Sequence, residues 1–227
     1  MIIAGLDLSP NSSGLTKFEL DNELNVIKSE YMGFTTVKKN SCENIHYYNP
    51  KHFNNYLDKV VWMKGKIQTF INDCSFIAIE DYAFSSVGKV FNIAEFAGII
   101  KEMAYNLLIS IRLYDPNSIK IFATDKGNCD KLSMYDAFEK LSVPYKHSMT
   151  HLPEVNKGNG VSPTSDIIDS FFICELLLLE LKLRKGLVYL KNYPEKVIKV
   201  MNRTTKSNPV NILAQDFIVK GYLNEFV

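Results

Sequence analysis

The sequence predicts an α/β fold in which a mixed five-stranded sheet is flanked by helices. Three short apolar runs, at residues 2–8, 14–20 and 26–34, follow one another with only turn-forming residues between them, as in an antiparallel meander. Helical and strand-like patterns then alternate along the chain, which favours helices on the faces of the sheet. At 227 residues with 46% apolar side chains, the chain can bury one sizeable core but is too short for two full domains.

The first half of the chain supplies four of the five expected strands. The first strand ends at Asp7, and the Ser-Pro-Asn-Ser-Ser-Gly sequence close behind it is a strong turn signal. After the meander, residues 35–50 are polar and are expected to be irregular. Residues 50–72 carry apolar side chains at helical intervals and predict a helix. The apolar run at residues 76–79 predicts a buried strand that delivers Glu80 at its end.

Helices dominate the second half of the chain. Residues 92–109 are apolar around most of a helical circumference, so this helix needs cover on more than one side. Residues 111–114 give the fifth strand. Three further helices are expected at residues 116–122, 130–141 and 165–184. Ser165 is the expected N-cap of the last helix.

The C-terminal part, residues 185–227, is expected to form a basic extension packed on a domain of residues 1–184. Between residues 182 and 206 only Glu195 is acidic, and the basic residues are Lys182, Arg184, Lys185, Lys191, Lys196, Lys199, Arg203 and Lys206. A solvated face that follows a buried helix would explain this charge equally well. The formal net charge of the whole chain is only +1, so any surface that binds phosphate must be a local patch.

The composition also limits where the protein works. The four cysteines have no paired spacing of the kind found in zinc ribbons or redox dithiols, and they are interpreted as reduced thiols of a cytoplasmic protein: Cys42, Cys74, Cys129 and Cys174. No basic leader precedes Asp7, and charged residues interrupt the longest apolar run, so no membrane segment is expected. We therefore expect a cytoplasmic protein, which means the host cytoplasm if a phage encodes it.

Four acidic residues lie at positions that suit a catalytic or metal-binding role better than that of solvated surface residues. Asp7 and Glu80 end two apolar strands that can be neighbours, and Asp166 and Asp169 share one face of a helix. Each has an ordinary explanation alone, as a turn residue or as a helix N-terminal acid. Together they would repel one another unless a cation lay between them. Oxygen ligands select Mg²⁺ or Mn²⁺, and two ions about 4 Å apart can support phosphodiester hydrolysis.

These motifs resemble the RuvC family of Holliday junction resolvases, particularly its divergent bacteriophage members, in the ribonuclease H-like superfamily. Gly-Leu-Asp-Leu-Ser at 5–9 and Ile-Ala-Ile-Glu-Asp at 77–81 are similar to the family's first two strand motifs. Ser-Asp-Ile-Ile-Asp-Ser at 165–170 is similar to its last helix, and residues 119–131 resemble its lysine-bearing segment. The resemblance covers about residues 1 to 182.

The resemblance implies a ribonuclease H-like fold, with two Mg²⁺ ions per site that Mn²⁺ can replace. The implied metal ligands are Asp7, Glu80, Asp166 and Asp169. The implied catalytic lysines are Lys120 and Lys131, and the implied DNA contacts are Lys120, Lys126, Asn128, Lys131, Tyr82 and Phe84. Two departures affect substrate recognition: Leu-Ser-Pro follows Asp7 where the cellular enzymes have Pro-Gly, and Ala83 stands where they have an aromatic residue that packs against a base.

The predicted function is a metal-dependent endonuclease of the crossover junction type, which cuts four-way or other branched DNA. A homodimer is expected because resolving a junction needs two cuts, and because one helix carries a broad apolar stripe made of Ile93, Phe96, Ile100, Met103, Leu107 and Leu108. Cover of this helix by the C-terminal extension is the alternative. A ribonuclease H-like nuclease acting on other nucleic acids, a two-lobed kinase-like ATPase and a non-catalytic DNA-binding protein are the competing functions.

Overall fold

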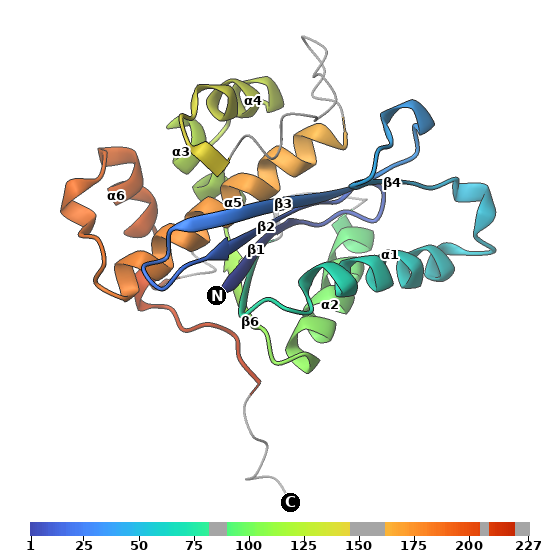
Figure 1. The fold of residues 1–227 in the computed structure, drawn as a ribbon, viewed down its shortest axis with the longest axis horizontal. Coiled ribbons are helices and arrows are strands. Elements are labelled where there is room, and N and C mark those ends of the chain that lie inside the picture. The colour runs from blue at the N-terminus through green and yellow to red at the C-terminus, as the bar shows by residue number, and fades with distance from the viewer. Residues whose placement is uncertain (82–89, 146–161, 205–208, 221–227) are drawn as a thin grey trace, which may run out of the picture.

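The computed structural model describes residues 1–81, 90–145, 162–204 and 209–220, which form a three-layered α/β structure (Figure 1). A six-stranded sheet lies in the middle, with the strand order β4-β3-β2-β1-β5-β6. Helices α1 (Tyr56–Ile71) and α2 (Val90–Asn106) cover one face of the sheet. The other face is covered by α5 (Thr164–Arg184), which packs directly on β1 and β2. The predicted α/β architecture is thus confirmed.

The strands follow the predicted order, with one strand more than expected. The three N-terminal strands β1 (Ile2–Asp7), β2 (Gly14–Leu20) and β3 (Val26–Thr35) form the antiparallel meander. Strands β5 (Phe76–Glu80) and β6 (Ser110–Tyr114) extend the sheet in parallel from β1. The prediction of five strands missed β4 (Ile45–Tyr47), which pairs in parallel with β3. Three residues are too few for an alternating pattern to be visible in the sequence.

The remaining helices form the layer around α5. Two of them pack against it, α3 (Pro116–Thr124) and α4 (Lys131–Lys140), and α6 (Glu195–Met201) packs on α3. The single helix predicted at residues 50–72 is wrong at its N-terminal end. A short 3-10 helix occupies Pro50–His52. Helix α1 begins at Tyr56, and the Asn55 side chain caps it by accepting a hydrogen bond from the Asp58 amide. In the described parts of the chain, none of the helices combines the length and apolar character needed to cross a bilayer.

Helix α5 is buried along almost its whole length, and two glycines of the sheet make its close approach possible. A Cβ atom on Gly5 would lie 2.3 Å from the Ser170 carbonyl oxygen, and one on Gly14 would lie 2.1 Å from the Asp166 carbonyl carbon. Side chains at these positions would push the helix off the sheet. The prediction that Ser165 is the N-cap is wrong: α5 begins at Thr164 after Pro163, and the Ser165 hydroxyl bonds with side chains instead.

The apolar stripe of α2 is covered mainly within the chain. Phe96, Ile100 and Met103 are buried in the core formed with α1 and the sheet. The expectation that a partner subunit covers them is therefore wrong for these three residues, because their cover is intramolecular. Of the predicted stripe, Leu108 is 73% exposed, and Phe91 at the start of the helix is 76% exposed.

A buried ionic network attaches the C-terminal segment to the domain. The Glu180 carboxylate accepts hydrogen bonds from Arg112 Nε at 3.0 Å, Tyr114 Oη at 2.6 Å and Arg184 Nε at 2.7 Å. Both arginines also donate to the Gln215 carbonyl and lie over the Phe217 ring. The last described residues then reach the edge of the sheet, where Ile218 and Ile111 exchange two backbone hydrogen bonds.

Candidate active site

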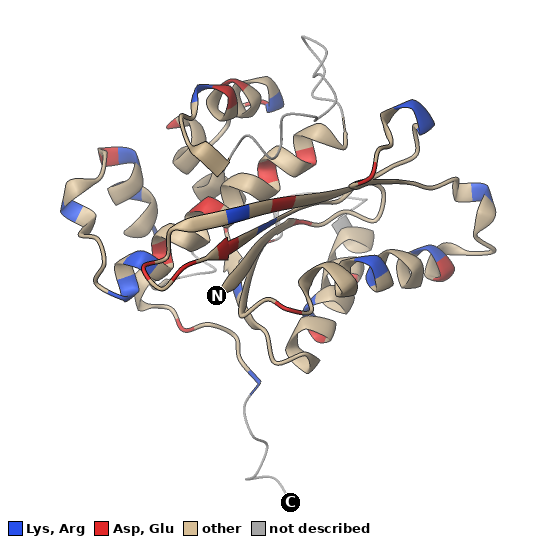
Figure 2. Ribbon diagram, in the orientation of Figure 1, with Lys and Arg blue, Asp and Glu red and all other residues tan. Residues whose placement is uncertain are grey.

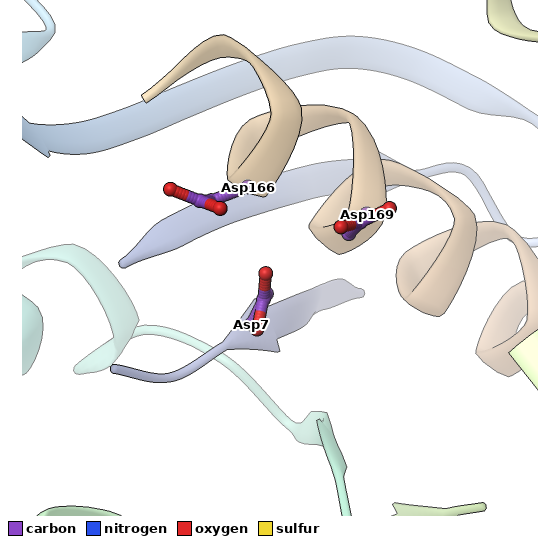
Figure 3. A group of neighbouring side chains, drawn as sticks. All are labelled: Asp7, Asp166 and Asp169. Atoms are coloured by element: carbon purple, nitrogen blue, oxygen red, sulfur yellow. The ribbon is translucent and has the colours of Figure 1, made fainter. Parts of the chain in front are cut away.

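Three carboxylates meet at the end of the first strand (Figure 3). Asp7 lies at the C-terminal end of β1, and Asp166 and Asp169 lie on the first turns of α5, so that all three side chains gather in the space between strand and helix. One oxygen atom from each of the three lies within 4.8 Å of the other two. The predicted i, i+3 pair and the predicted strand-end carboxylate are thus brought together in one group.

The backbone explains this convergence. Strands β1 and β5 are parallel neighbours with Leu6 opposite Ile79, so Asp7 and Glu80 follow at adjacent strand ends. The spacing of Asp166 and Asp169 directs both side chains to one side of α5. Because Gly14 has no side chain, the first turn of α5 can lie directly on β2 and bring both aspartates close to Asp7.

Glu80 is outside the three-carboxylate group but interacts with it electrostatically. Its charge raises the pKa of Asp7, and the charge of Asp169 raises the pKa of Glu80. All four predicted carboxylates therefore lie in one region, with Glu80 at its margin.

Burial and mutual repulsion raise the pKa values of this region. Burial has the largest effect on Asp7, whose pKa is raised well above its ordinary value, with further contributions from Glu80, Asp166 and Asp169. Burial followed by repulsion from Asp169 raises the pKa of Glu80 to about 7. Burial also raises the pKa of Asp169 to about 6, against an opposing effect of Lys131. Raised pKa values mean that the ionised forms of these acids are unfavourable, because the carboxylates are buried and repel one another. A bound cation would stabilise the ionised forms.

Asp166 is held in place by four donors. Its Oδ2 atom accepts hydrogen bonds from the hydroxyls of Ser12, at 2.5 Å, and Ser162. Its Oδ1 atom accepts from Lys131 Nζ at 3.0 Å and from the Ser165 hydroxyl at 3.3 Å. The carboxylate orientation is thus determined by the turn after β1, by the residues just before α5 and by the start of α4.

The two predicted catalytic lysines both reach this region. Lys131 forms the ion pair with Asp166, while its side chain remains 48% exposed. Burial lowers the pKa of Lys131, but the carboxylates of Asp166, Asp169 and Asp7 together outweigh this effect and leave the pKa raised, so the ammonium stays charged. Lys120 on α3 stabilises the charges of Glu80 and Asp169 and lowers their pKa values.

The other predicted DNA contacts lie in an exposed loop or outside the described residues. Lys126 and Asn128 are exposed in the loop between α3 and α4. Tyr82 and Phe84 lie outside the described residues.

The carboxylate group fits a hard divalent cation. Oxygen ligands bind Mg²⁺ or Ca²⁺ at about 2.0 to 2.6 Å, so two ligands on opposite sides of one ion are at most about 5 Å apart. The spacing within the Asp7, Asp166 and Asp169 group satisfies this limit. Its donors are carboxylate oxygens without histidine or cysteine, which favours Mg²⁺ or Mn²⁺ over zinc.

Sequence reasoning missed the residues that support the carboxylates. Ser12 and Ser162 are separated by 150 positions, yet their hydroxyls lie 2.7 Å apart and both bond with Asp166. The serine-rich segment after Asp7 predicted only a turn. The one available signal was its position, immediately after a candidate ligand, where a turn brings its side chains back to the strand end.

The fold and the acidic group define a class: an α/β protein with a mixed six-stranded sheet and carboxylates clustered at the end of its first strand. Compared by sequence alone, the chain matches no protein-family model and no curated protein. Compared by structure, it has the fold of RuvC. Thermus thermophilus RuvC matches it with a TM-score of 0.50 and 13% identity, over 82% of this chain and 97% of that one.

Two structures with bound DNA are also similar. T. thermophilus RuvC in complex with Holliday junction substrate matches with a TM-score of 0.51 and 14% identity, over 82% of this chain and 97% of the other. The fowlpox virus resolvase in complex with substrate Holliday junction DNA matches with a TM-score of 0.49 and 18% identity, over 80% and 99%. The two T. thermophilus RuvC matches confirm the predicted ribonuclease H-like fold of RuvC type.

Proposed function

We propose that the chain is a metal-dependent endonuclease that hydrolyses phosphodiester bonds in four-way or other branched DNA. The convergence of Asp7, Asp166 and Asp169 within 4.8 Å at the end of β1 is the observation that carries this proposal. A cluster of buried acids with raised pKa values destabilises a fold, so its presence in a RuvC-like framework favours a function that uses the charge.

The proposed metal ligands are Asp7, Glu80, Asp166 and Asp169, with two Mg²⁺ ions as the cofactor. Such ions would supply an activated water and neutralise charge on the phosphate. Ser12 and Ser162 orient the Asp166 carboxylate through their hydrogen bonds. Lys131 and Lys120 provide positive charge beside the carboxylates, where it can stabilise a phosphate that gains negative charge in the transition state.

Branched DNA is the proposed substrate because T. thermophilus RuvC, whose fold the chain shares, is similar to it in a complex with Holliday junction substrate. A four-way junction has approximate twofold symmetry and is resolved by cuts on two opposed strands, so we propose that a homodimer acts on it. Exposed apolar side chains on α1, on α2 and in the turn after α2 offer a surface on which two copies could meet: Leu57, Val61, Phe91 and Leu108.

The test is cleavage of labelled four-way junction, linear duplex and RNA–DNA hybrid, each with Mg²⁺, with Mn²⁺ and with EDTA. We expect metal-dependent cleavage of the junction, at least 100-fold faster than that of duplex. Asp7→Asn should abolish cleavage but leave junction binding intact, whereas Asp136→Asn, which changes an exposed acid on α4, should leave the rate unchanged. Light scattering of the same samples should give twice the monomer mass.

Three outcomes would count against the proposal. If the wild-type protein cleaves none of the substrates with either metal, it is not a nuclease of this type. Cleavage of the hybrid alone would change the substrate class and keep the site. Retained activity in Asp7→Asn would show that the carboxylate group is not the catalytic centre.

A further inference from the structure

A strongly basic segment lies far from the carboxylates. Between residues 182 and 203 the chain has seven Lys and Arg residues and one acid, a net charge of +6. Since the whole chain has a net charge of +1, the remainder carries −5. The segment is therefore a region of positive charge on a protein that is otherwise acidic. Figure 2 shows Lys and Arg residues at the end of α5, in the turn that follows and on α6.

Some of these cations bind an acid or a backbone carbonyl of the described chain, and others do not. Arg184 binds Glu180, Arg203 binds Asp115 at 3.2 Å, and Lys196 donates to the Ala123 carbonyl at 3.2 Å. By contrast, Lys185, Lys191 and Lys199 are exposed, and none forms an ion pair with an acid of the described chain. The fold accounts for the first three residues but not for the last three.

An exposed aromatic residue lies among the lysines that form no ion pair. Tyr189 is 64% exposed, and Lys191 Nζ lies 5.8 Å from the centre of its ring. Leu187, two residues earlier, is 45% exposed. Lysines neutralise the phosphates of duplex DNA, and a tyrosine hydroxyl is among the groups that bond with phosphate oxygens, so exposed lysines beside an exposed tyrosine suit a surface that binds the DNA backbone.

The position of this segment relative to the carboxylates follows from α5. Asp166 lies in the first turn of α5 and Lys185 directly follows its last residue. A helix of 21 residues is about 30 Å long, which equals about nine base pairs of duplex DNA. The contacts of Lys196 and Arg203 with the two ends of α3 join the segment to the helix that carries Lys120.

We propose that Lys185, Tyr189, Lys191 and Lys199 form an arm-binding surface, which binds the sugar-phosphate backbone of duplex DNA about nine base pairs from the phosphate that is cut. The identity of the cut substrate rests on the proposed function, but the surface itself does not include any residue of the candidate active site. Binding here would hold one arm of a branched substrate roughly parallel to the axis of α5, and so fix the direction in which the arm leaves the carboxylates.

The test measures binding in EDTA, so it does not depend on cleavage. Four-way junctions with arms of 20 and of 7 base pairs are compared, because only the longer arm can reach from the carboxylates to the arm-binding surface. The variant K185E/K191E/K199E removes the charge of that surface. The matched control K51E/K66E/K220E makes the same change in net charge at three other exposed lysines. Lys51 lies in the 3-10 helix before α1, and Lys66 lies on α1, which covers the opposite face of the sheet from α5.

The surface variant should bind the long-armed junction at least 10-fold more weakly than the wild type, with a shallower dependence of log affinity on log salt concentration by about two to three units. Its affinity for the short-armed junction should change less than twofold, as should the control variant's affinity for both. Tyr189→Ala should weaken only the binding of the long-armed junction.

Two results would overturn the proposal. Equal losses of affinity in the surface and control variants would show that only the net charge of the protein matters. Equal losses of affinity for the long-armed and short-armed junctions would show that these residues do not bind the distant part of the arm. If the wild type fails to cleave any DNA, long and short linear duplexes still test the surface separately from the proposed function.

Discussion

Replacing Glu80 by glutamine should stabilise the metal-free protein at pH 8 while removing its activity. Burial and repulsion from Asp169 raise the pKa of Glu80 from its ordinary 4.5 to about 7, so the folded protein holds this proton longer than the unfolded chain does. The stabilisation from the neutral carboxyl is complete below pH 4.5 and is lost as the pH rises through about 7.

The size of this effect follows from the pKa shift. A shift of about 2.5 units corresponds to at most about 3 to 4 kcal/mol, at about 1.4 kcal/mol per unit. Because the Glu80 side chain is partly exposed and coupled to its neighbours, we expect about 1 to 2 kcal/mol at pH 8. Glutamine keeps the shape of the side chain without the charge, so the variant should be more stable than the wild type at pH 8 and nearly equal to it at pH 5.

Urea unfolding in EDTA, followed by circular dichroism at pH 5 and pH 8, measures this difference directly. Glu19→Gln, an exposed position on β2, is the control and should leave the free energy of unfolding unchanged at both pH values. Adding Mg²⁺ at pH 8 should stabilise the wild type more than the Glu80 variant. A Glu80→Gln protein that is less stable than the wild type at pH 8 in EDTA would refute the argument that these carboxylates repel one another.

Three further substitutions test other parts of the structure. Lys131→Ala should lower the turnover at saturating DNA about 100-fold with a smaller effect on affinity; an affinity loss alone would make Lys131 a positioning contact. Gly14→Ala should abolish cleavage and lower the unfolding free energy by at least about 2 kcal/mol, because its Cβ would collide with the Asp166 backbone; a fully active, stable variant would contradict the close packing of α5. Glu180→Ala should lower the urea-unfolding free energy by about 3 to 5 kcal/mol by leaving Arg112 buried without its partner, and a loss below about 1 kcal/mol would show that the network contributes little.

The sequence was sufficient to predict that the carboxylates come together, because each one is marked by a local pattern. Asp7 and Glu80 interrupt apolar runs at the point where a strand must end, and the spacing of Asp166 and Asp169 places them on one helical face. The sheet order then brings the two strand ends side by side, as the alternation of elements suggests.

The support around the carboxylates could not be predicted in this way. The hydroxyls of Ser12 and Ser162 come together only because α5 packs on the sheet, and no pattern in the sequence around either serine indicates this contact. The role of Gly14 likewise depends on a contact with Asp166 that is distant in sequence. The N-cap expected at Ser165 failed because the hydroxyl has stronger partners, the Asp166 carboxylate and the Lys131 ammonium, than the helix amides it was expected to cap.

The hydrogen bonds between Ile218 and Ile111 affect how copies of the protein can associate. Strand β6 is one border of the sheet, and the C-terminal segment occupies part of its outer backbone groups. The opposite border is β4, which is only three residues long and offers few groups for another strand to join. Sheets with borders of this kind do not readily grow by adding strands from neighbouring molecules. Two copies would therefore have to associate through their helical layers, and the sheet of each would remain separate.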